Sequence, residues 1–212
     1  MILHGYWRSG TSYRTRIALN LKGLGYEQAG IDLRLGIQKS DAYLSMNPQG
    51  LVPALETDGA VLTQSPAILE WLEEAHPEPP LLPPDPVARA RVRAMAALVA
   101  CDIHPLNNLR VLKALRESFG ADQAATDAWA ARWITTGFEA LEALVGRHGD
   151  GWCFGAAPTL ADCCLVPQIY SARRFNTPLD AFPRILAIEE RAAAHPAFMA
   201  AHPDRQPDAD VR

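Results

Sequence analysis

The sequence predicts an α/β domain followed by an all-helical domain. Strand and helix patterns alternate over the first eighty residues, whereas the pattern beyond residue 87 is helical almost throughout. Between these regions, the segment from Pro77 to Pro86 holds six of the chain's 17 prolines, which excludes a continuous helix and indicates a semi-rigid linker. We therefore expect domains at residues 1–82 and 87–212.

The first region has the elements of a small sheet with accompanying helices. The expected strands are Met1–Tyr6, Tyr26–Leu33, Leu51–Glu56 and Ala60–Thr63. The expected helices are Ser12–Lys22, Ser40–Met46 and Ser65–Ala75. Thr57-Asp58-Gly59 predicts a hairpin turn, and Ser65 followed by Pro66 predicts an N-cap at the start of the last helix. This βαβ-α-ββα order is that of a thioredoxin-like domain.

The second region is predicted to be helical. Its expected helices are Val87–Phe119, Asp122–Val145, Leu160–Ala172 and Phe182–Ala194. Pro105 lies inside the first of them and should kink it. Thr159 and Asp162 have the spacing of a capping box at the start of the third. The Pro- and Asp-rich end from Pro203 is expected to fray.

The composition is that of an ordinary globular protein, with 49% hydrophobic and 21% charged residues among 212. A formal net charge of -4 gives no general attraction to nucleic acid or anionic lipid. No apolar run is long enough to span a bilayer, and the N-terminus lacks the pattern of a secretion signal. We therefore expect neither a nucleic-acid partner nor a membrane partner.

The four cysteines form no C-x-x-C pair. Adjacent Cys163 and Cys164 would point to different faces of a helix, so neither a disulfide framework nor a zinc site is expected. Buried free thiols in a reducing cytoplasm fit this usage better. Because no cysteine precedes Cys101, thiol chemistry near the N-terminus would have to come from a ligand.

The segment Trp7–Leu19 joins a predicted strand to a helix start, where unpaired N–H groups and the helix dipole favour an anion. It carries three hydroxyl side chains and three cations, namely Ser9, Thr11, Ser12, Arg8, Arg14 and Arg16. This combination suits a thiolate or a carboxylate. A plain N-cap with a solvated basic first turn is the alternative that the segment by itself leaves open.

Two further motifs predict backbone groups that are placed to bind a ligand. Val52-Pro53 opens a predicted strand, where proline is often cis, and a cis bond would leave the Val52 N–H and C=O free to pair with a peptide-like ligand. Gln64-Ser65 precedes a helix, so the Ser65 N–H and hydroxyl face that N-terminus. Either a ligand carboxylate or simple capping would account for Ser65.

Five polar side chains interrupt the apolar pattern after the linker, namely Asp102, His104, Asn107, Asn108 and Arg110. The spacing places His104, Asn107 and Asn108 near one face of the expected helix. Such a group indicates either a helix that lines a cleft or an unusually solvated one. No second ligand lies at metal spacing from His104, so no metal site is expected.

Arg173 and Arg174 end the helix that is expected to begin after Thr159. Cations at this place often interact with the helix C-terminus. The pair also offers a guanidinium fork for a substrate carboxylate, and the sequence leaves both interpretations open.

Together these motifs resemble the zeta class of glutathione transferases. The class motif Ser-Ser-Cys-Ser-Trp-Arg-x-Arg-Ile-Ala-Leu is matched by Ser9–Leu19 except at Gly10, Thr11 and Tyr13. Three further patterns of the class recur at Asn47–Pro53, Gln64-Ser65 and Ala161–Gln168. The resemblance covers nearly the whole chain, and it implies the glutathione transferase architecture and a homodimer.

The resemblance also implies that glutathione is the cofactor. Its sulfur would lie among the hydroxyls of Ser9, Thr11 and Ser12. The other implied contacts are Gly10, Gln38 at the glycyl end, Val52 at the cysteinyl backbone, Gln64 and Ser65 at the γ-glutamyl group, and Asp102, His104, Asn107 and Asn108. Thr11 stands where the class has a cysteine, which excludes a nucleophile on the protein there, and Asn107 stands where it has a glutamine.

Within the class, Trp7–Ser12 and Cys101–Pro105 resemble bacterial glutathione-dependent isomerases. This implies a cytoplasmic enzyme that converts maleylpyruvate to fumarylpyruvate by addition of the thiolate to the cis double bond, rotation and elimination. Arg8, Arg110 and Arg174 are expected to bind the carboxylates of this small dicarboxylate substrate. Three alternatives remain open, which are maleylacetoacetate isomerisation, conjugation of electrophiles and non-catalytic binding.

Overall fold

The computed structural model describes residues 1–210, which form two compact units. The first unit is Met1–Leu81 together with the described chain from Ala193 onward, and the second unit is Leu82–Ala192. The first boundary falls within the proline-rich segment. The return of the C-terminal segment to the first unit differs from the expected assignment of residues 87–212 to one helical domain.

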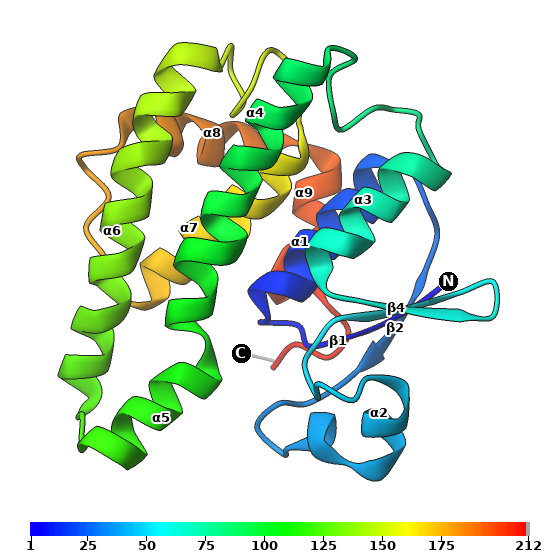
Figure 1. Ribbon diagram of the computed structural model, residues 1–212, viewed down its shortest axis with the longest axis vertical. Helices are drawn as coiled ribbons and strands as arrows, with labels where there is room; N and C mark the ends of the chain where they lie inside the picture. The colour runs from blue at the N-terminus through cyan, green and yellow to red at the C-terminus, as the bar shows by residue number, and fades with distance from the viewer. Residues whose placement is uncertain (211–212) are drawn as a thin grey trace. The chain divides into compact units, whose positions relative to one another are not determined.

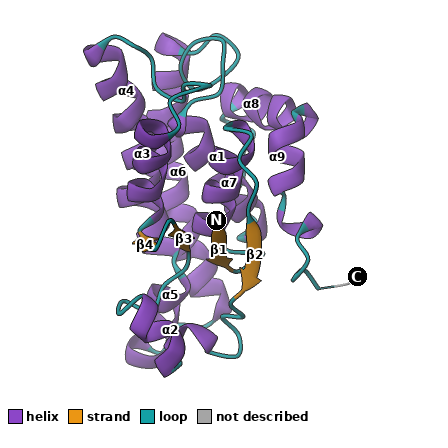
Figure 2. Cartoon of the chain, turned by 90° about the vertical axis from the view of Figure 1, so that its right-hand side faces the viewer, coloured by secondary structure: helices purple, strands orange, loops and turns teal. Residues whose placement is uncertain are grey.

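The first unit is built on a four-stranded sheet with the strand order β2-β1-β3-β4 (Figure 2). Its strands are β1 (Ile2–Gly5), β2 (Glu27–Gly30), β3 (Ala54–Thr57) and β4 (Ala60–Thr63). β1 runs parallel to β2 and antiparallel to β3, and β3 is antiparallel to β4. Leu3 on β1 faces Leu55 on β3, and both are fully buried. Burial stabilises such side chains by roughly 1.5–3 kcal/mol each, so this pair anchors the core of the unit.

The helices of the first unit pack around α1. The described helices are α1 (Gly10–Leu21), α2 (Asp41–Met46), α3 (Ser65–Ala75) and α9 (Pro196–Ala201), with the short 3₁₀ turns η1 (Ile37–Lys39) and η4 (Pro203–Arg205). α1 packs against both α3 and α9, as Figure 1 shows, and its Ile17 and Leu19 are fully buried. The predicted βαβ-α-ββα order is confirmed, whereas α9 has no counterpart among the predicted helices.

The C-terminal segment is held in place, which corrects the expectation that it frays from Pro203. The Asp208 carboxylate accepts hydrogen bonds from the Trp7 N–H at 2.9 Å and from the Gln28 side-chain amide at 2.5 Å. Asp208, whose charge suggested a solvated tail, thus provides the acceptor for a backbone N–H group in the turn after β1. The last two residues of the chain lie outside the described residues.

The second unit is helical. Its described elements are α4 (Pro86–Ala97), the π-helical segment η2 (Leu98–Ile103), the 3₁₀ turn η3 (His104–Asn107), α5 (Leu109–Phe119), α6 (Gln123–His148), α7 (Leu160–Arg174) and α8 (Pro183–Ala194). α7 packs against α4 and α6, and α6 also packs against η2. The helical content predicted for this region is confirmed.

The prediction of one continuous helix over residues 87–119 is wrong. The α-helical pattern ends at Ala97 and resumes only at Leu109. Pro105 has no N–H group and cannot continue a hydrogen-bond ladder. Asn108 then takes an extended conformation and caps α5 by accepting from the Arg110 N–H at 3.1 Å. The kink expected at Pro105 is therefore a complete break.

The capping box predicted at the start of α7 is confirmed. Asp162 is fully buried, and its Oδ2 accepts from both the N–H and the hydroxyl of Thr159 at 2.8 Å. Its Oδ1 accepts from the Cys153 N–H at 2.8 Å. Burial raises the pKa of the Asp162 carboxyl. This one side chain ties the start of α7 to the loop that precedes it.

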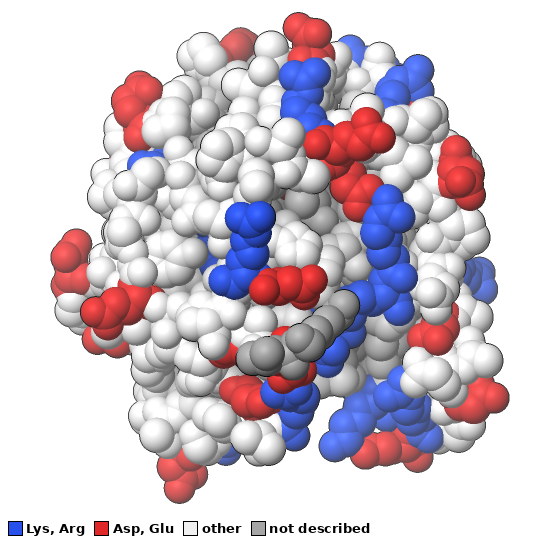
Figure 3. All heavy atoms as spheres, turned by 180° about the vertical axis from the view of Figure 1, so that it is seen from behind, with Lys and Arg blue, Asp and Glu red and all other residues white. Residues whose placement is uncertain are grey.

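Surface charges are mixed in sign, and the expectation of buried thiols holds for three of the four cysteines but not for Cys101. Figure 3 shows acidic and basic side chains interspersed on the face that it presents. The cysteines are free thiols, of which Cys153, Cys163 and Cys164 are buried and Cys101 is exposed. Within residues 1–210, no helix is both long and apolar enough to cross a membrane.

Candidate active site

A pair of hydroxyl side chains lies at the start of α1. Ser9 is the N-cap, and its Oγ accepts from the Ser12 N–H at 3.3 Å. Ser9 Oγ and Thr11 Oγ1 lie 2.9 Å apart, and Thr11 Oγ1 donates to the Val52 C=O at 2.8 Å. Because Ser9 acts as the cap, the helix begins at Gly10, two residues before the predicted start. The contacts join α1 to the segment that precedes β3.

The directions of these hydrogen bonds follow from the donors available. A hydroxyl group has one proton, and the Thr11 proton is directed at the Val52 carbonyl, which can only accept. The proton between the two hydroxyls therefore belongs to Ser9. Ser9 can redirect its proton to a ligand by rotating the hydroxyl, whereas Thr11 would have to release a carbonyl. The two hydroxyls are thus not equivalent.

Ser12 has a different role from the one expected. It is fully buried, and its Oγ accepts from the Tyr6 N–H at 3.3 Å. A Cβ atom on Gly5 would lie 3.0 Å from this oxygen, so a larger residue there would crowd the Ser12 hydroxyl. Ser12 therefore stabilises the turn between β1 and α1. This placement differs from the expectation that its hydroxyl faces a ligand sulfur.

The three arginines of the segment Trp7–Leu19 lie in different environments. Arg14 is 2% exposed and Arg16 is 0% exposed, which excludes the solvated basic first turn. Arg16 donates to the C=O groups of Trp7 at 2.8 Å and Ala201 at 3.0 Å, so it supports the backbone. Arg8 is partly exposed, and its guanidinium lies 5.2 Å from the centre of the Trp7 ring in a cation–π contact.

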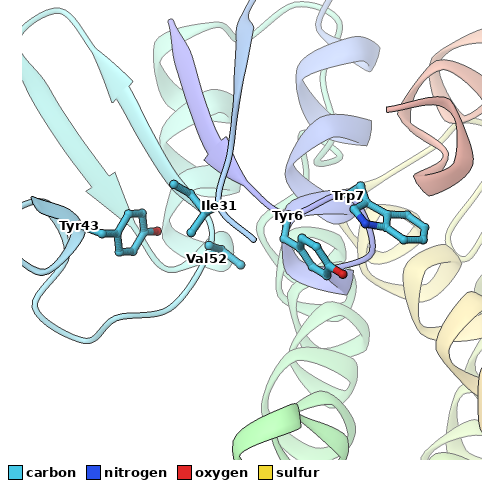
Figure 4. Packing of buried hydrophobic residues seen from close by; sticks show 5 residues of the cluster. All are labelled: Tyr6, Trp7, Ile31, Tyr43 and Val52. Atoms are coloured by element: carbon cyan, nitrogen blue, oxygen red, sulfur yellow. The ribbon is translucent and has the colours of Figure 1, made fainter. Parts of the chain in front are cut away.

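The Val52–Pro53 peptide bond is cis, as the sequence indicates. Val52 is 9% exposed and lies in an apolar cluster. Figure 4 shows this cluster, which contains Tyr6, Trp7, Ile31, Tyr43 and Val52. The Val52 C=O already accepts from Thr11, which differs from the expectation that both polar groups of Val52 are free.

The loop before Val52 is fixed by two partly buried hydrogen bonds. The Leu51 C=O accepts from the Tyr43 hydroxyl at 2.8 Å and from the Asn47 amide at 2.7 Å. Burial raises the pKa of Tyr43 to about 12, so its hydroxyl stays protonated and donates. The position of the loop is thereby set from inside the unit.

The start of α3 has no side-chain cap. Gln64 is the N-cap, with φ 66° in the region that favours glycine, and its side chain makes no capping hydrogen bond. The prediction of Ser65 as the N-cap is wrong, because Ser65 is the first helical residue. The Ser65 Oγ instead accepts from Arg14 Nη1 at 3.1 Å. The exposed Gln64 amide donates to Gln49 Oε1 at 2.5 Å.

Gln38 lies beside the same loop. Its backbone oxygen would be 2.8 Å from a Cβ atom on Gly50, whose φ of 60° also favours glycine. Gln38 Oε1 is buried and has no hydrogen-bond partner within residues 1–210. It is therefore an unused acceptor next to the loop that carries the cis-proline.

The first unit thus brings most of the predicted contacts of this region together. Ser9, Thr11 and Val52 are linked by hydrogen bonds, and Ser65 is linked to α1 through Arg14. Arg14 was expected only as part of a basic segment, although a cation among the apolar residues of a helix indicates a fixed partner. Gln49, the partner of Gln64, gave no signal in the sequence.

The polar residues after the linker do not share one helix face. Asp102 is exposed in η2, and His104 is half-buried at the start of η3. Asn107 is buried, and its Nδ2 has no partner within the described residues. Asn108 caps α5, and Arg110 is exposed on its first turn. The face predicted from helical spacing is lost because the helix breaks between these residues.

The two arginines at the end of α7 differ in their contacts. Arg173 pairs with Glu189, with Nε donating to Oε1 at 2.7 Å. Arg174 is exposed, and its guanidinium lies 5.9 Å from the centre of the Phe175 ring. The contact with Glu189 ties the end of α7 to α8.

Comparison with known proteins gives consistent matches along the chain. The N-terminal domain of glutathione S-transferases matches residues 8–75, and their C-terminal domain matches residues 127–200. A maleylpyruvate isomerase from a Ralstonia species is 54% identical over 210 residues, which are 98% of this chain and 99% of that protein. A maleylacetoacetate isomerase from Pseudomonas aeruginosa is 53% identical over 211 residues, which are 98% of each.

A solved structure extends the similarity to the fold. The maleylacetoacetate isomerase from Methylobacterium extorquens, crystallised with malonate and glutathione, has a TM-score of 0.95 and 41% identity over 100% of both chains. Both domains of the transferase therefore match in order, and the relatives align over nearly their full length. This chain belongs to the glutathione S-transferase family.

Proposed function

We propose that this chain is a glutathione-dependent cis–trans isomerase that converts maleylpyruvate to fumarylpyruvate. The observation that carries the proposal is the Ser9–Thr11 hydroxyl pair at the N-terminus of α1. Hydroxyl donors and a helix N-terminus stabilise a thiolate, yet no cysteine precedes Cys101 in the chain. None of the four cysteines lies in the first unit, so the unit that holds these hydroxyls supplies no thiol of its own. Glutathione is the thiol in the structure of the Methylobacterium relative.

The polar groups of the first unit fit a small peptide. The start of α3 has no side-chain cap, and Gln38 Oε1 has no partner within residues 1–210, so donors and an acceptor are available there. The residues that we propose to hold glutathione in this unit are Ser9, Gly10, Thr11, Gln38, Val52, Gln64 and Ser65. In the second unit, the zeta-class resemblance implies four further glutathione contacts, which are Asp102, His104, Asn107 and Asn108.

Ser9 acts on the protonation state of the thiol. A hydrogen bond to the charged form and the positive end of α1 both lower a thiol pKa. When bound, glutathione supplies the thiol that adds to the cis double bond, allows rotation and leaves unchanged. Thr11 holds the Val52 carbonyl, which fixes the cis-proline loop relative to Ser9.

We propose that Arg8, Arg110 and Arg174 bind the carboxylates of the substrate. Each is at least partly exposed, and a guanidinium can bind a carboxylate through two parallel hydrogen bonds. The malonate in the Methylobacterium relative supports a dicarboxylate as the class of substrate.

The choice between the two candidate acids is tested by their relative rates. Sequence identity does not separate them, because the relatives named for each acid are 54% and 53% identical. Three arginines suit a compact dianion, so we expect kcat/KM for maleylpyruvate to exceed that for maleylacetoacetate by about tenfold or more. Both rates are measured at one glutathione concentration. A ratio that favours maleylacetoacetate would assign the chain to that substrate.

We also infer a homodimer in the cytoplasm. The homodimer follows from the zeta-class resemblance. Three buried free thiols support a reducing compartment, because disulfides would form more readily in an oxidising one.

A further inference from the structure

Arg14 is a buried cation without a counter-ion. Its side chain is 2% exposed, and Nη1 donates to Ser65 Oγ at 3.1 Å. Within residues 1–210 it forms no ion pair, and its Nε has no hydrogen-bond partner. A buried charge without a partner is costly, so it indicates that an anion is brought to the site by a ligand.

The contact with Arg14 orients the Ser65 hydroxyl. A guanidinium can only donate, so Ser65 Oγ accepts and its own proton points elsewhere. That proton has no acceptor within the described residues. Ser65 is also the first residue of α3, whose N-cap supplies no side-chain hydrogen bond. The hydroxyl proton, the free N–H groups and the helix dipole all favour the same anion.

We propose that Arg14 is a positioning residue for the α-carboxylate of the γ-glutamyl residue of glutathione, a proposal that rests on the function proposed above. Arg14 holds the Ser65 hydroxyl as a donor, and the carboxylate neutralises the buried guanidinium. Ser65 is 2% exposed, and its neighbour Gln64 is exposed and donates to Gln49, so the approach to the start of α3 lies on the side of Gln64.

The test compares two ligands on the full chain by titration calorimetry. One is glutathione, and the other is γ-aminobutyryl-cysteinyl-glycine, which is glutathione without that carboxylate. The wild-type protein should bind glutathione about ten- to a hundredfold more tightly, as expected for charge-assisted hydrogen bonds. Arg14→Met should lose most of this preference and bind the analogue as the wild type does. Its ligand-free unfolding temperature should be unchanged or higher, because an unpaired buried charge is removed.

Arg16→Lys is the matched control, because Arg16 is buried on the same helix but donates to backbone C=O groups. It should lower the unfolding temperature and leave the ratio of the two dissociation constants unchanged. If Arg14→Met does not fold, Arg14→Lys provides the test. Lysine keeps the charge but loses the guanidinium fork, so the proposed role predicts a preference for glutathione between those of the wild type and zero. A purely structural role of Arg14 predicts the wild-type preference.

The outcomes separate this inference from the proposed function. A wild-type preference in the Arg14 variants overturns the role of Arg14 while glutathione binding stands. A wild-type protein that does not bind glutathione overturns the proposed function and the role of Arg14 with it.

Discussion

Ser9→Ala is expected to lower kcat/KM for the glutathione-dependent isomerisation by about ten- to a hundredfold, the effect of removing one charge-assisted hydrogen bond. Ser9 is the hydroxyl whose proton can be redirected to a thiolate, because the Thr11 proton is held by the Val52 carbonyl. Without it, the pKa of the bound thiol rises and less thiolate is present at a given pH. The acidic limb of the pH–rate profile should therefore move to higher pH, which steady-state rates measured across pH will show.

Thr11→Val is the matched control for this prediction. Valine keeps the shape of the side chain but cannot donate to the Val52 carbonyl. We expect weaker glutathione binding, seen as a higher KM, with a smaller displacement of the pH profile than in Ser9→Ala. Equal displacement in the two variants, or none in Ser9→Ala, would contradict the unequal roles of the hydroxyls.

Asp162→Ala is expected to destabilise the folded protein by about 2–5 kcal/mol. The change leaves the backbone N–H groups of Thr159 and Cys153 without acceptors in a fully buried place. Asp162→Asn should be nearly as harmful, because both carboxylate oxygens accept and an amide has only one acceptor oxygen. Urea unfolding followed by circular dichroism measures the loss.

Asp122→Ala is the control, because the Asp122 carboxylate also accepts from a backbone N–H at a helix start, that of Ala125 at 2.8 Å, but Asp122 is the N-cap of α6 and is exposed. Water can replace an exposed cap, so this variant should lose only about 1 kcal/mol. Similar losses for the two variants would show that burial does not govern the cost of removing the Asp162 carboxylate.

Local patterns predicted much of the fold. The order of elements in the first unit and the capping box of α7 follow from alternation, caps and turns, which are properties of short segments. The continuous helix over residues 87–119 failed because the sequence showed a kink at Pro105 but not that Asn108 would leave the helical conformation. The docking of Asp208 on Trp7 was missed because the two residues lie at opposite ends of the chain.

The sequence predicted which residues belong to the site better than it predicted how they contact one another. Hydroxyls at a helix start and a proline opening a strand are visible in the sequence, so Ser9, Thr11 and Val52 could be named. The bond from Thr11 to the Val52 carbonyl depends on how the strands pair, and the burial of Ser12 and Arg14 depends on packing around α1. These properties are tertiary, and single-sequence periodicity carries no information on them.

The most direct test of the account is the fate of glutathione during turnover. The protein is incubated with maleylpyruvate and glutathione at a small fraction of the substrate concentration, and proton NMR follows the alkene and the thiol together. We predict complete conversion to fumarylpyruvate with the free thiol unchanged at the end, because the Ser9 hydroxyl and the N-terminus of α1 stabilise a thiolate that is regenerated in each cycle. Conversion that stops when glutathione is consumed as a conjugate, or that proceeds at the same rate without glutathione, would contradict the proposed function.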